Sequence, residues 1–303
     1  MSLVVLEDAN LSFGGKKILQ GVNLHIGEGD RIGLIGLNGS GKSTLLRVIV
    51  GQQGLDGGIA RSSKNCRIGY LPQDVLELAG ESLLNSVLQT VPGRGDIEQR
   101  IEETQVSLSE TQEPERQLVL ATTLADLHER LEHFEVYFSA RRAQSILVGL
   151  GFKEKDFSRA TSELSGGWKM RAALAGLLFQ RPDVFLLDEP TNHLDVPSVR
   201  WLNGFLAESK AAMLLICHDR EFLNKHVDRI FSFEPEGLRV YRGDYDSYLE
   251  QREGEKEIIE ARARNRDREI KELERFVERF RAKATKARQA QSRAKQIKRL
   301  QKD

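Results

Sequence analysis

The chain has 303 residues, of which 40% are hydrophobic and 30% are charged, and its formal net charge is zero. This length and composition are typical of a soluble globular protein with one large core or two smaller ones. No apolar run reaches the roughly 18 residues that a membrane-spanning helix needs, and the first residues lack the pattern of a secretion signal, so we expect a cytoplasmic protein.

The first 70 residues predict strands, a loop and a helix in that order. Short β segments are indicated at residues 3–13, 21–26 and 31–36, and a helix follows at about residues 44–51. The spacing of the apolar residues changes from two in the strands to nearly four in the helix. The helix therefore begins directly after a glycine-rich turn.

Residues 94–135 form an acidic insertion with four Arg against eleven Asp and Glu residues. The segment contains no group of convergent polar residues, so a solvated pair of helices is favoured over a catalytic role. We expect a helical hairpin because apolar residues recur at helical spacing. These residues are Ile97, Ile101, Leu124, Leu127 and Leu131.

Helices and strands alternate after this insertion. Helices are predicted at about residues 139–150 and 168–180, and strands at 184–189 and 211–218. Such alternation is typical of a parallel sheet that is covered by helices on both faces.

The two cysteines, Cys66 and Cys217, lie far apart and neither belongs to a CxxC motif. This spacing argues against a disulfide framework or a metal site and favours two buried free thiols.

Residues 246–280 consist almost entirely of helix-favouring residues. The stretch 280–293 then mixes small and basic residues, and an apolar face resumes near the end of the sequence, so we expect a hairpin of two long helices. The apolar residues of the two helices are Ile270, Leu273, Val277, Phe280, Ile297 and Leu300.

Charge is distributed unevenly along the chain. From residue 251 onward there are 18 Lys and Arg residues against 10 Asp and Glu residues, so residues 1–250 carry an excess of acid. A positive segment on an acidic body suggests nucleic acid or an acidic surface as a partner, although many charge-rich helices are only solvated.

The sequence GLNGSGKST at residues 36–44 fits the phosphate-loop pattern, since it follows an apolar strand and precedes a helix. Glycines let successive backbone N–H groups face a phosphate at the start of the helix. Lys42 can neutralise phosphate oxygens and the Ser43 hydroxyl can bind Mg²⁺. The candidate phosphate-binding residues are Gly36, Asn38, Gly39, Ser40, Gly41, Lys42, Ser43 and Thr44.

The buried strand at residues 184–187 ends at a pair of acids, Asp188 and Glu189. Parallel sheets place ligands at the carboxyl ends of their strands, so both carboxylates are expected beside the phosphate loop. We predict that Asp188 holds Mg²⁺ and that Glu189 polarises the attacking water. A solvated turn or a helix cap is the alternative interpretation of the pair.

Three further features accompany the phosphate loop and the acids. The sequence LSGGW at residues 164–168 places Ser165 and two glycines before a helix, where backbone N–H groups favour an anion. His218 ends a strand and can donate a hydrogen bond to a γ-phosphate, and the amide of Gln73 can contact metal and water. Each feature alone has an ordinary structural alternative: a capped loop, a structural histidine and a surface glutamine.

Taken together, these motifs resemble those of ATP-binding cassette proteins in order and in approximate spacing. The resemblance implies an α/β fold: an ABC-type nucleotide-binding domain with a parallel-sheet RecA-like core, an antiparallel β subdomain and a helical subdomain carrying an inserted arm. It also implies binding and hydrolysis of ATP with Mg²⁺ at a composite site. There, Ser165, Gly166 and Gly167 would contact the γ-phosphate held by a second cassette. Phe13 matches the aromatic residue that stacks on adenine, with a core phenylalanine as the alternative.

Finer features are similar to the ABC-F proteins. They are TNHLD after the acids, Trp168 in place of the glutamine usual in transporters, HDREFL after His218, and GDYDSYLEQRE before a charged hairpin. Members of this family lack membrane domains, so no membrane subunit is expected, and those studied bind the ribosome. The resemblance therefore implies rRNA and tRNA as partners of the basic hairpin, with a role in translation, ribosome assembly or ribosome protection.

The same resemblance divides the chain into a cassette domain at residues 1–245 and a basic helical linker at residues 246–303. The cassette would contain a helical subdomain at about residues 74–180, with the arm at about 94–135. Because the sequence holds one cassette, we expect the second to come from a longer chain or from a homodimer, and we expect low ATPase activity from this piece alone.

Two other functions share parts of this pattern. A DNA-associated ATPase of repair or recombination would also carry a basic helical hairpin. The ATPase subunit of a membrane transporter is a weaker match because neither Trp168 nor the charged hairpin suits it.

Overall fold

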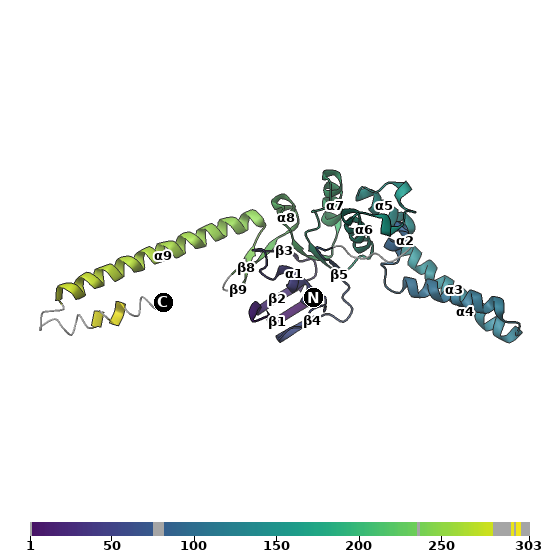
Figure 1. Cartoon of the computed structure of the whole chain (residues 1–303), viewed down its shortest axis with the longest axis horizontal. Coiled ribbons are helices and arrows are strands. Elements are labelled where there is room, and N and C mark those ends of the chain that lie inside the picture. The colour runs from purple at the N-terminus through teal and green to yellow at the C-terminus, as the bar shows by residue number, and fades with distance from the viewer. Residues whose placement is uncertain (1, 75–81, 235–236, 281–291, 294, 298–303) are drawn as a thin grey trace. The chain divides into compact units, whose positions relative to one another are not determined.

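The computed structural model describes residues 2–74, 82–234, 237–280, 292–293 and 295–297. The chain divides into two compact units, Met1–Tyr245 and Asp246–Asp303. Figure 1 labels the helices and strands of both.

The first unit contains two β-sheets. One is a three-stranded antiparallel sheet in the order β2-β1-β4, and the other is a six-stranded sheet in the order β5-β6-β7-β3-β8-β9. Neighbouring strands of the larger sheet run parallel except for β8 and β9, which are antiparallel. The strands are β1 (Ser2–Phe13), β2 (Lys16–Gly27), β3 (Arg31–Gly36), β4 (Gly57–Ser62), β5 (Ile68–Leu71), β6 (Val184–Asp188), β7 (Ala212–Ile216), β8 (Arg229–Glu234) and β9 (Gly237–Arg242).

Eight α-helices of the described residues belong to this unit. Residues 154–156 and 161–163 add two short 3₁₀ turns. The helices are α1 (Lys42–Ile49), α2 (Leu83–Leu88), α3 (Arg94–Glu110), α4 (Pro114–Tyr137), α5 (Ala140–Gly149), α6 (Gly166–Phe179), α7 (Val196–Glu208) and α8 (Arg220–His226).

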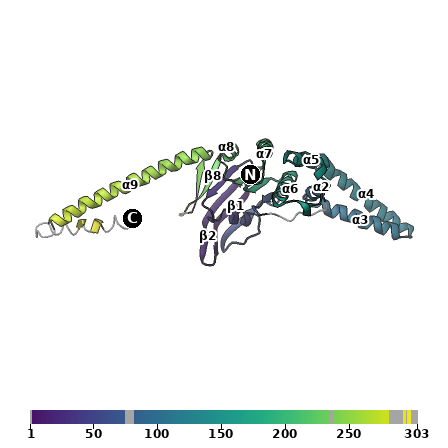
Figure 2. The same ribbon diagram turned by 45° about the horizontal axis from the view of Figure 1, so that its top comes forward.

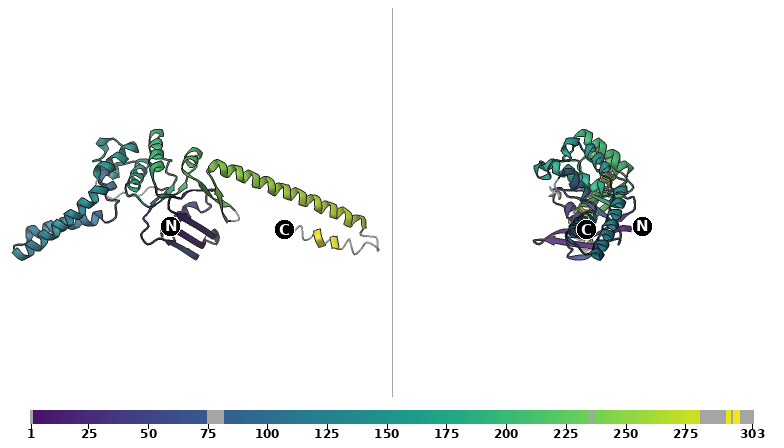
Figure 3. Two further views of the ribbon diagram at one scale, coloured as in Figure 1. Left: turned by 180° about the vertical axis from the view of Figure 1, so that it is seen from behind. Right: turned by 90° about the vertical axis from the view of Figure 1, so that its right-hand side faces the viewer.

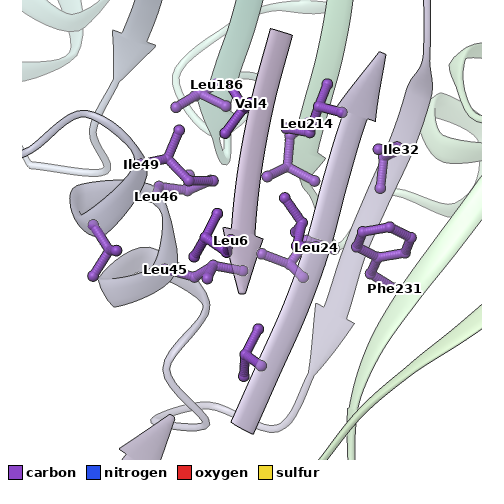
Figure 4. Packing of buried hydrophobic residues seen from close by; sticks show 14 of the residues in the cluster. Val4, Leu6, Leu24, Ile32, Leu45, Leu46, Ile49, Leu186, Leu214 and Phe231 are labelled. Carbon is purple, nitrogen blue, oxygen red and sulfur yellow. The ribbon is translucent and has the colours of Figure 1, made fainter. Parts of the chain in front are cut away.

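The main hydrophobic core lies between the two sheets and includes α1. Figure 4 shows Leu45 and Leu46 of α1 beside Leu6 of β1 and Leu24 of β2. Alternate residues of β6, such as Leu186, complete this core from the larger sheet. Burying a side chain of this size stabilises the fold by about 1.5–3 kcal/mol relative to exposure. The core therefore holds α1 in place against the two sheets.

The central strands are buried on both faces, as parallel sheets require. All five residues of β6 and all five of β7 are buried. On the face away from α1, Leu177 of α6 lies against Gly69 and Leu223 of α8 lies against Gly33. The predicted parallel sheet with helices on both faces is therefore confirmed.

The arm predicted at residues 94–135 consists of α3 and α4, which lie side by side as an antiparallel pair (Figure 3). Ile97, Ile101 and Leu127 form its small core. Near the base of the arm, the buried Arg94 side chain donates from Nη1 to the carbonyl oxygen of Phe138 at 3.3 Å. Helices α2, α5 and α6 pack against one another next to it (Figure 2).

The second unit is dominated by the long helix α9 (Tyr245–Phe280). The predicted turn at residues 280–293 lies largely outside the described residues, as does Leu300. Ile297 is buried, and Gln296 Nε2 donates to Glu269 Oε1 at 3.3 Å, which places part of the returning segment beside α9. Among the helices that the structure describes, none has both the length and the apolar character needed to cross a membrane.

Candidate functional site

A cavity of about 500 Å³ lies where the carboxyl ends of β3, β6 and β7 meet the start of α1. Most of the residues predicted for phosphate and metal binding line it. The lining comprises Ile18, Asn38, Gly39, Gly41, Lys42, Ser43, Thr44, Arg47, Gln73, Asp188, Glu189, Asn192, Ile216 and His218.

The phosphate loop curls because two of its glycines have left-handed backbone angles, with φ of 76° at Gly39 and 105° at Gly41. Such angles strain residues that carry a Cβ atom. Gly41 occupies the N-cap of α1, and no side chain of the described residues caps that helix. The backbone N–H groups at the start of α1 are therefore available to an anion, and the helix dipole favours negative charge there.

Lys42 is buried, and its Nζ donates to the carbonyl oxygens of Gly36 at 2.9 Å and Leu37 at 3.1 Å. The loop that would bind a phosphate therefore also holds the ammonium group of Lys42. Burial lowers the pKa of Lys42, while the charges of Asp188 and Glu189 raise it. Those carboxylates thus favour the charged form of Lys42, which a phosphate ligand requires.

Asp188 and Glu189 are both buried, with exposed fractions of 1% and 8%. Burial raises the pKa of both carboxyl groups. Among the described groups, Asp188 Oδ2 has no hydrogen-bond partner, and the nearby Ser43 hydroxyl lowers the pKa of Asp188. A buried carboxylate oxygen without a partner beside a hydroxyl is a donor set that suits Mg²⁺, so these residues fit the metal that the sequence predicts.

Glu189 has an unusual backbone conformation, with φ of 53°. Its N–H donates to the carbonyl oxygen of Ile216 at 2.8 Å, which ties the end of β6 to β7. The N–H of His218 lies 3.4 Å from Glu189 Oε2, and His218 Nε2 lies 3.4 Å from Oε1. A left-handed backbone conformation in a residue other than glycine costs free energy that the surrounding structure must offset. Residues strained in this way concentrate at functional sites.

Gln73 is exposed at the edge of the cavity, two residues after the end of β5. Because β5 pairs with β6 up to the register Leu71 with Leu187, the segment after β5 leads directly toward Asp188. The structure therefore brings Gln73, Asp188, Glu189, His218 and the phosphate loop together.

Other predicted residues lie apart from this cavity lining. Gly36 and Ser40 belong to the phosphate loop but do not line the cavity, and Phe13 is 48% exposed and also lies outside the lining. The signature segment, Ser165, Gly166 and Gly167, lies at the start of α6 and likewise contributes nothing to the lining. The roles assigned to these residues stay predictions.

Four lining residues escaped the sequence prediction: Ile18, Arg47, Asn192 and Ile216. Arg47 lies further along α1 than Lys42, and Asn192 lies in the turn after Glu189. The position of each residue next to a recognised motif was the available signal in the sequence. Neither Arg47 nor Asn192 belongs to a spacing pattern of its own. Ile18 belongs to β2, which reaches the cavity only through the packing of the smaller sheet.

The fold and this constellation define an ATP-binding-cassette ATPase domain. Two solved structures support the fold. An ATP-binding subunit of an ABC transporter matches with a TM-score of 0.59 at 18% identity, over 82% of this chain and 92% of that one. A dimeric post-hydrolysis state of the cassette MJ0796 bound to ADP and Pi matches with a TM-score of 0.54 at 20% identity, over 79% of this chain and 98% of that one.

Sequence comparisons identify the family within this class of ATPase domains. A family model described as "ABC transporter" matches residues 19–192, and a second model with the same description matches residues 231–303. The probable ATP-binding protein YbiT of Escherichia coli O157:H7 is 36% identical over 97% of this chain and 54% of its own length. YheS of Escherichia coli K12 is 35% identical over 99% of this chain and 45% of its own length.

The human ATP-binding cassette sub-family F member 3 is 34% identical over 98% of this chain and 40% of its own length. The chain belongs to the ABC-F family of ATP-binding cassette proteins. It spans about half the length of the curated relatives it matches.

Proposed function

We propose that this chain binds ATP with Mg²⁺ in the cavity above the phosphate loop, hydrolyses ATP when a second cassette closes over it, and uses that closure to act on the ribosome. The observation that carries the proposal is the convergence of Lys42, Ser43, Asp188 and Glu189 at one cavity. Residues 1–245 would form the cassette, with a helical subdomain at about 74–180, and residues 246–303 the linker.

In this proposal the phosphate loop binds the triphosphate. Backbone N–H groups at the start of α1 donate to the β-phosphate, and Lys42 exchanges its hydrogen bonds with two loop carbonyls for bonds to β- and γ-oxygens. Ser43, Gln73 and Asp188 would hold Mg²⁺, which when bound neutralises charge on the phosphate oxygens. Phe13 would stack on the adenine ring.

Glu189 is the proposed base. A buried carboxylate with a raised pKa at the cavity polarises the attacking water more effectively than a solvated one. His218, whose side chain is 70% exposed at the cavity edge, would donate a hydrogen bond to the γ-phosphate. Both roles require the phosphate to lie between the phosphate loop and the end of β6.

The site would be completed by a second cassette. The signature segment lies outside the cavity lining, and Ser165 and Gly166 are exposed, so they are free to contact a nucleotide held by another copy of this architecture. That copy would be either the other half of a longer chain or a second molecule in a homodimer. We expect weak hydrolysis from the isolated chain because the opposing segment is missing.

The ribosome is the proposed partner because of family membership and of the charge of the linker. Residues 281–303 carry nine Lys and Arg residues against one Asp, so the positive charge of the C-terminal region is concentrated there. Contacts from this segment to the phosphates of rRNA or tRNA would weaken steeply with salt. We expect a cytoplasmic protein without a membrane subunit.

The test uses the intact natural protein with Glu189→Gln, which should accumulate the ATP-bound state. We expect this variant to sediment with ribosomes in the presence of MgATP, and to do so less as salt is raised. The matched control carries Lys42→Ala as well and should stay in the supernatant. Retention only on DNA would favour a repair or recombination ATPase, and recovery only with membranes would favour a transporter subunit; either result would overturn the ribosomal assignment.

A further inference from the structure

Arg171 of α6 contacts three residues from two other segments with one guanidinium group. Its Nε donates to the carbonyl oxygen of His193 at 2.7 Å, and its Nη1 donates to the carbonyl oxygen of Leu150 at 3.1 Å. The same Nη1 forms an ion pair with Asp195 Oδ2 at 3.2 Å. The Arg171 side chain is only 11% exposed, which strengthens its hydrogen bonds, whereas the Asp195 side chain is 53% exposed, so solvent weakens the ion pair.

The guanidinium group is also held from the side. It lies over the ring of Trp168 at 4.6 Å, and the Trp168 ring packs against Phe152 at 4.8 Å between centroids. Gly151 leaves the necessary room, since a Cβ atom there would lie 2.8 Å from Arg171 Nη1. A lysine cannot reproduce this arrangement because it lacks the planar fork.

The contacts join two parts of the proposed site. Arg171 and Trp168 belong to the first turns of α6, directly after Ser165, Gly166 and Gly167. Its partner His193 lies in the turn that follows Glu189, close to Asn192 of the nucleotide cavity.

That turn is itself tied to Glu189. The N–H of Asn192 donates to the carbonyl oxygen of Glu189 at 3.3 Å, and the N–H of Leu194 donates to that of Thr191 at 3.1 Å. Asp195 then caps α7 through the N–H of Ser198 at 3.0 Å. A displacement of Glu189 would therefore be carried along a short hydrogen-bonded turn to the group that holds α6.

We propose that Arg171 is a positioning residue that couples nucleotide binding in this cassette to the position of its own signature segment, and through it to the nucleotide of a second cassette. The inference rests on the proposed function, because it requires the cavity to bind ATP. Arg171 does not line that cavity, so it acts through the turn at residues 189–195 and not by touching nucleotide.

The test uses Trp168 as a reporter. The chain has two tryptophans, so Trp201→Phe leaves Trp168 as the single tryptophan, which can be excited selectively over the tyrosines. We expect its emission to change saturably when a non-hydrolysable ATP analogue is added with Mg²⁺. Arg171→Gln should reduce the amplitude of that change by about tenfold while the analogue's Kd, measured by calorimetry, shifts by less than about threefold.

Two further variants distinguish coupling from a purely structural role of Arg171. Arg171→Lys keeps the positive charge but lacks the planar guanidinium group, so the amplitude of its emission change should fall between those of the parent and Arg171→Gln. If the glutamine variant does not fold, the lysine variant provides the test of coupling. Arg200→Gln, which changes an exposed arginine of α7, should behave like the parent. In the intact natural protein Arg171→Lys should lower kcat by about tenfold and leave KM nearly unchanged.

The outcomes separate this inference from the proposed function. An unchanged amplitude in both Arg171 variants, or no emission change in the parent despite measured binding, would overturn the coupling. A fall in amplitude matched by an equal loss of affinity would also overturn it and leave a structural role. Failure of the parent chain to bind the analogue at all would instead reject ATP binding itself.

Discussion

His218 Nε2 lies 3.4 Å from Glu189 Oε1, across the boundary between an exposed imidazole and a buried carboxylate. The two residues follow neighbouring strands, because β6 pairs with β7 up to the register Asp188 with Ile216. Burial raises the pKa of Glu189 and the charge of His218 lowers it. The pair thus places a candidate base and a candidate phosphate donor at one cavity edge.

Replacing Glu189 by Gln should leave ATP binding nearly intact and abolish hydrolysis. The amide has the same shape but cannot polarise water as a carboxylate does, and loss of a general base lowers rates by about 10²–10⁴-fold. Phosphate release by the intact natural protein and equilibrium binding of ATP would measure the two effects. Hydrolysis within threefold of the unchanged protein, an effect of about 0.7 kcal/mol or less, would remove Glu189 from the role of base.

Replacing Lys42 by Ala should weaken MgATP binding by about 10–100-fold, because a charge-assisted hydrogen bond contributes roughly 1.5–3 kcal/mol. The variant also leaves the carbonyl oxygens of Gly36 and Leu37 without the donor that they have now. Lys64→Ala, an exposed lysine outside the cavity, is the control and should bind normally. Calorimetric titration with MgATP measures both affinities. Equal affinities for the two variants would contradict the role of Lys42 in phosphate binding.

The sequence predicted those parts of the site that local patterns specify. The phosphate loop has its own spacing, and the apolar runs at β6 and β7 show that both strands are buried. The acids at the end of β6 and the histidine after β7 must then lie at one edge of the sheet. The arm was predictable for a similar reason, since its apolar residues recur at helical spacing.

Elements formed by tertiary pairing were not predictable in the same way. β4 has no buried residue, so its sequence carries no apolar alternation, and it is a strand because it pairs with β1. The helix predicted from Trp168 begins at Gly166, because Ser165 takes the N-cap position. The contacts of Arg171 depend on segments more than 20 residues away, at Leu150 and His193, which no local pattern reveals.

Alanine at two helical glycines should change stability in opposite directions. A Cβ atom at Gly149 of α5 would lie 2.1 Å from the Trp201 ring, so Gly149→Ala forces a core rearrangement that costs about 1–3 kcal/mol. At Gly204 of α7 no atom in the described part of the chain lies within 4 Å of the added atom. Gly204→Ala should therefore stabilise the protein by about 0.5–1 kcal/mol through helix propensity.

Urea unfolding of both variants measures these changes in the free energy of unfolding. The glycine pair controls for the substitution itself, since both residues lie in helices and differ in their surroundings. Equal effects of the two substitutions would mean that Trp201 does not pack over α5 as described.

Lowering the pH should destabilise the fold through His226. This side chain is 1% exposed, and its Nε2 lies 2.7 Å from Asn203 Oδ1, while among the described groups its buried Nδ1 has no hydrogen-bond partner. Burial, with the nearby charges of Arg31 and Lys225, lowers the pKa of His226 from 6.5 to about 4. The neutral ring is therefore the form that fits between α7 and α8.

The unfolded chain takes up a proton near pH 6.5, whereas the folded chain does so only near pH 4. Between these values the unfolded state binds more protons, so the stability that is present above pH 6.5 is lost as the pH falls. By pH 5 the loss from this residue should be about 1–2 kcal/mol. His226→Gln removes the titration and should flatten that part of the profile, while His25→Gln, at an exposed strand position, should leave it unchanged. Urea unfolding at intervals from pH 7.5 to about 5 tests this, and identical slopes for the two variants would show that another group controls the acid sensitivity.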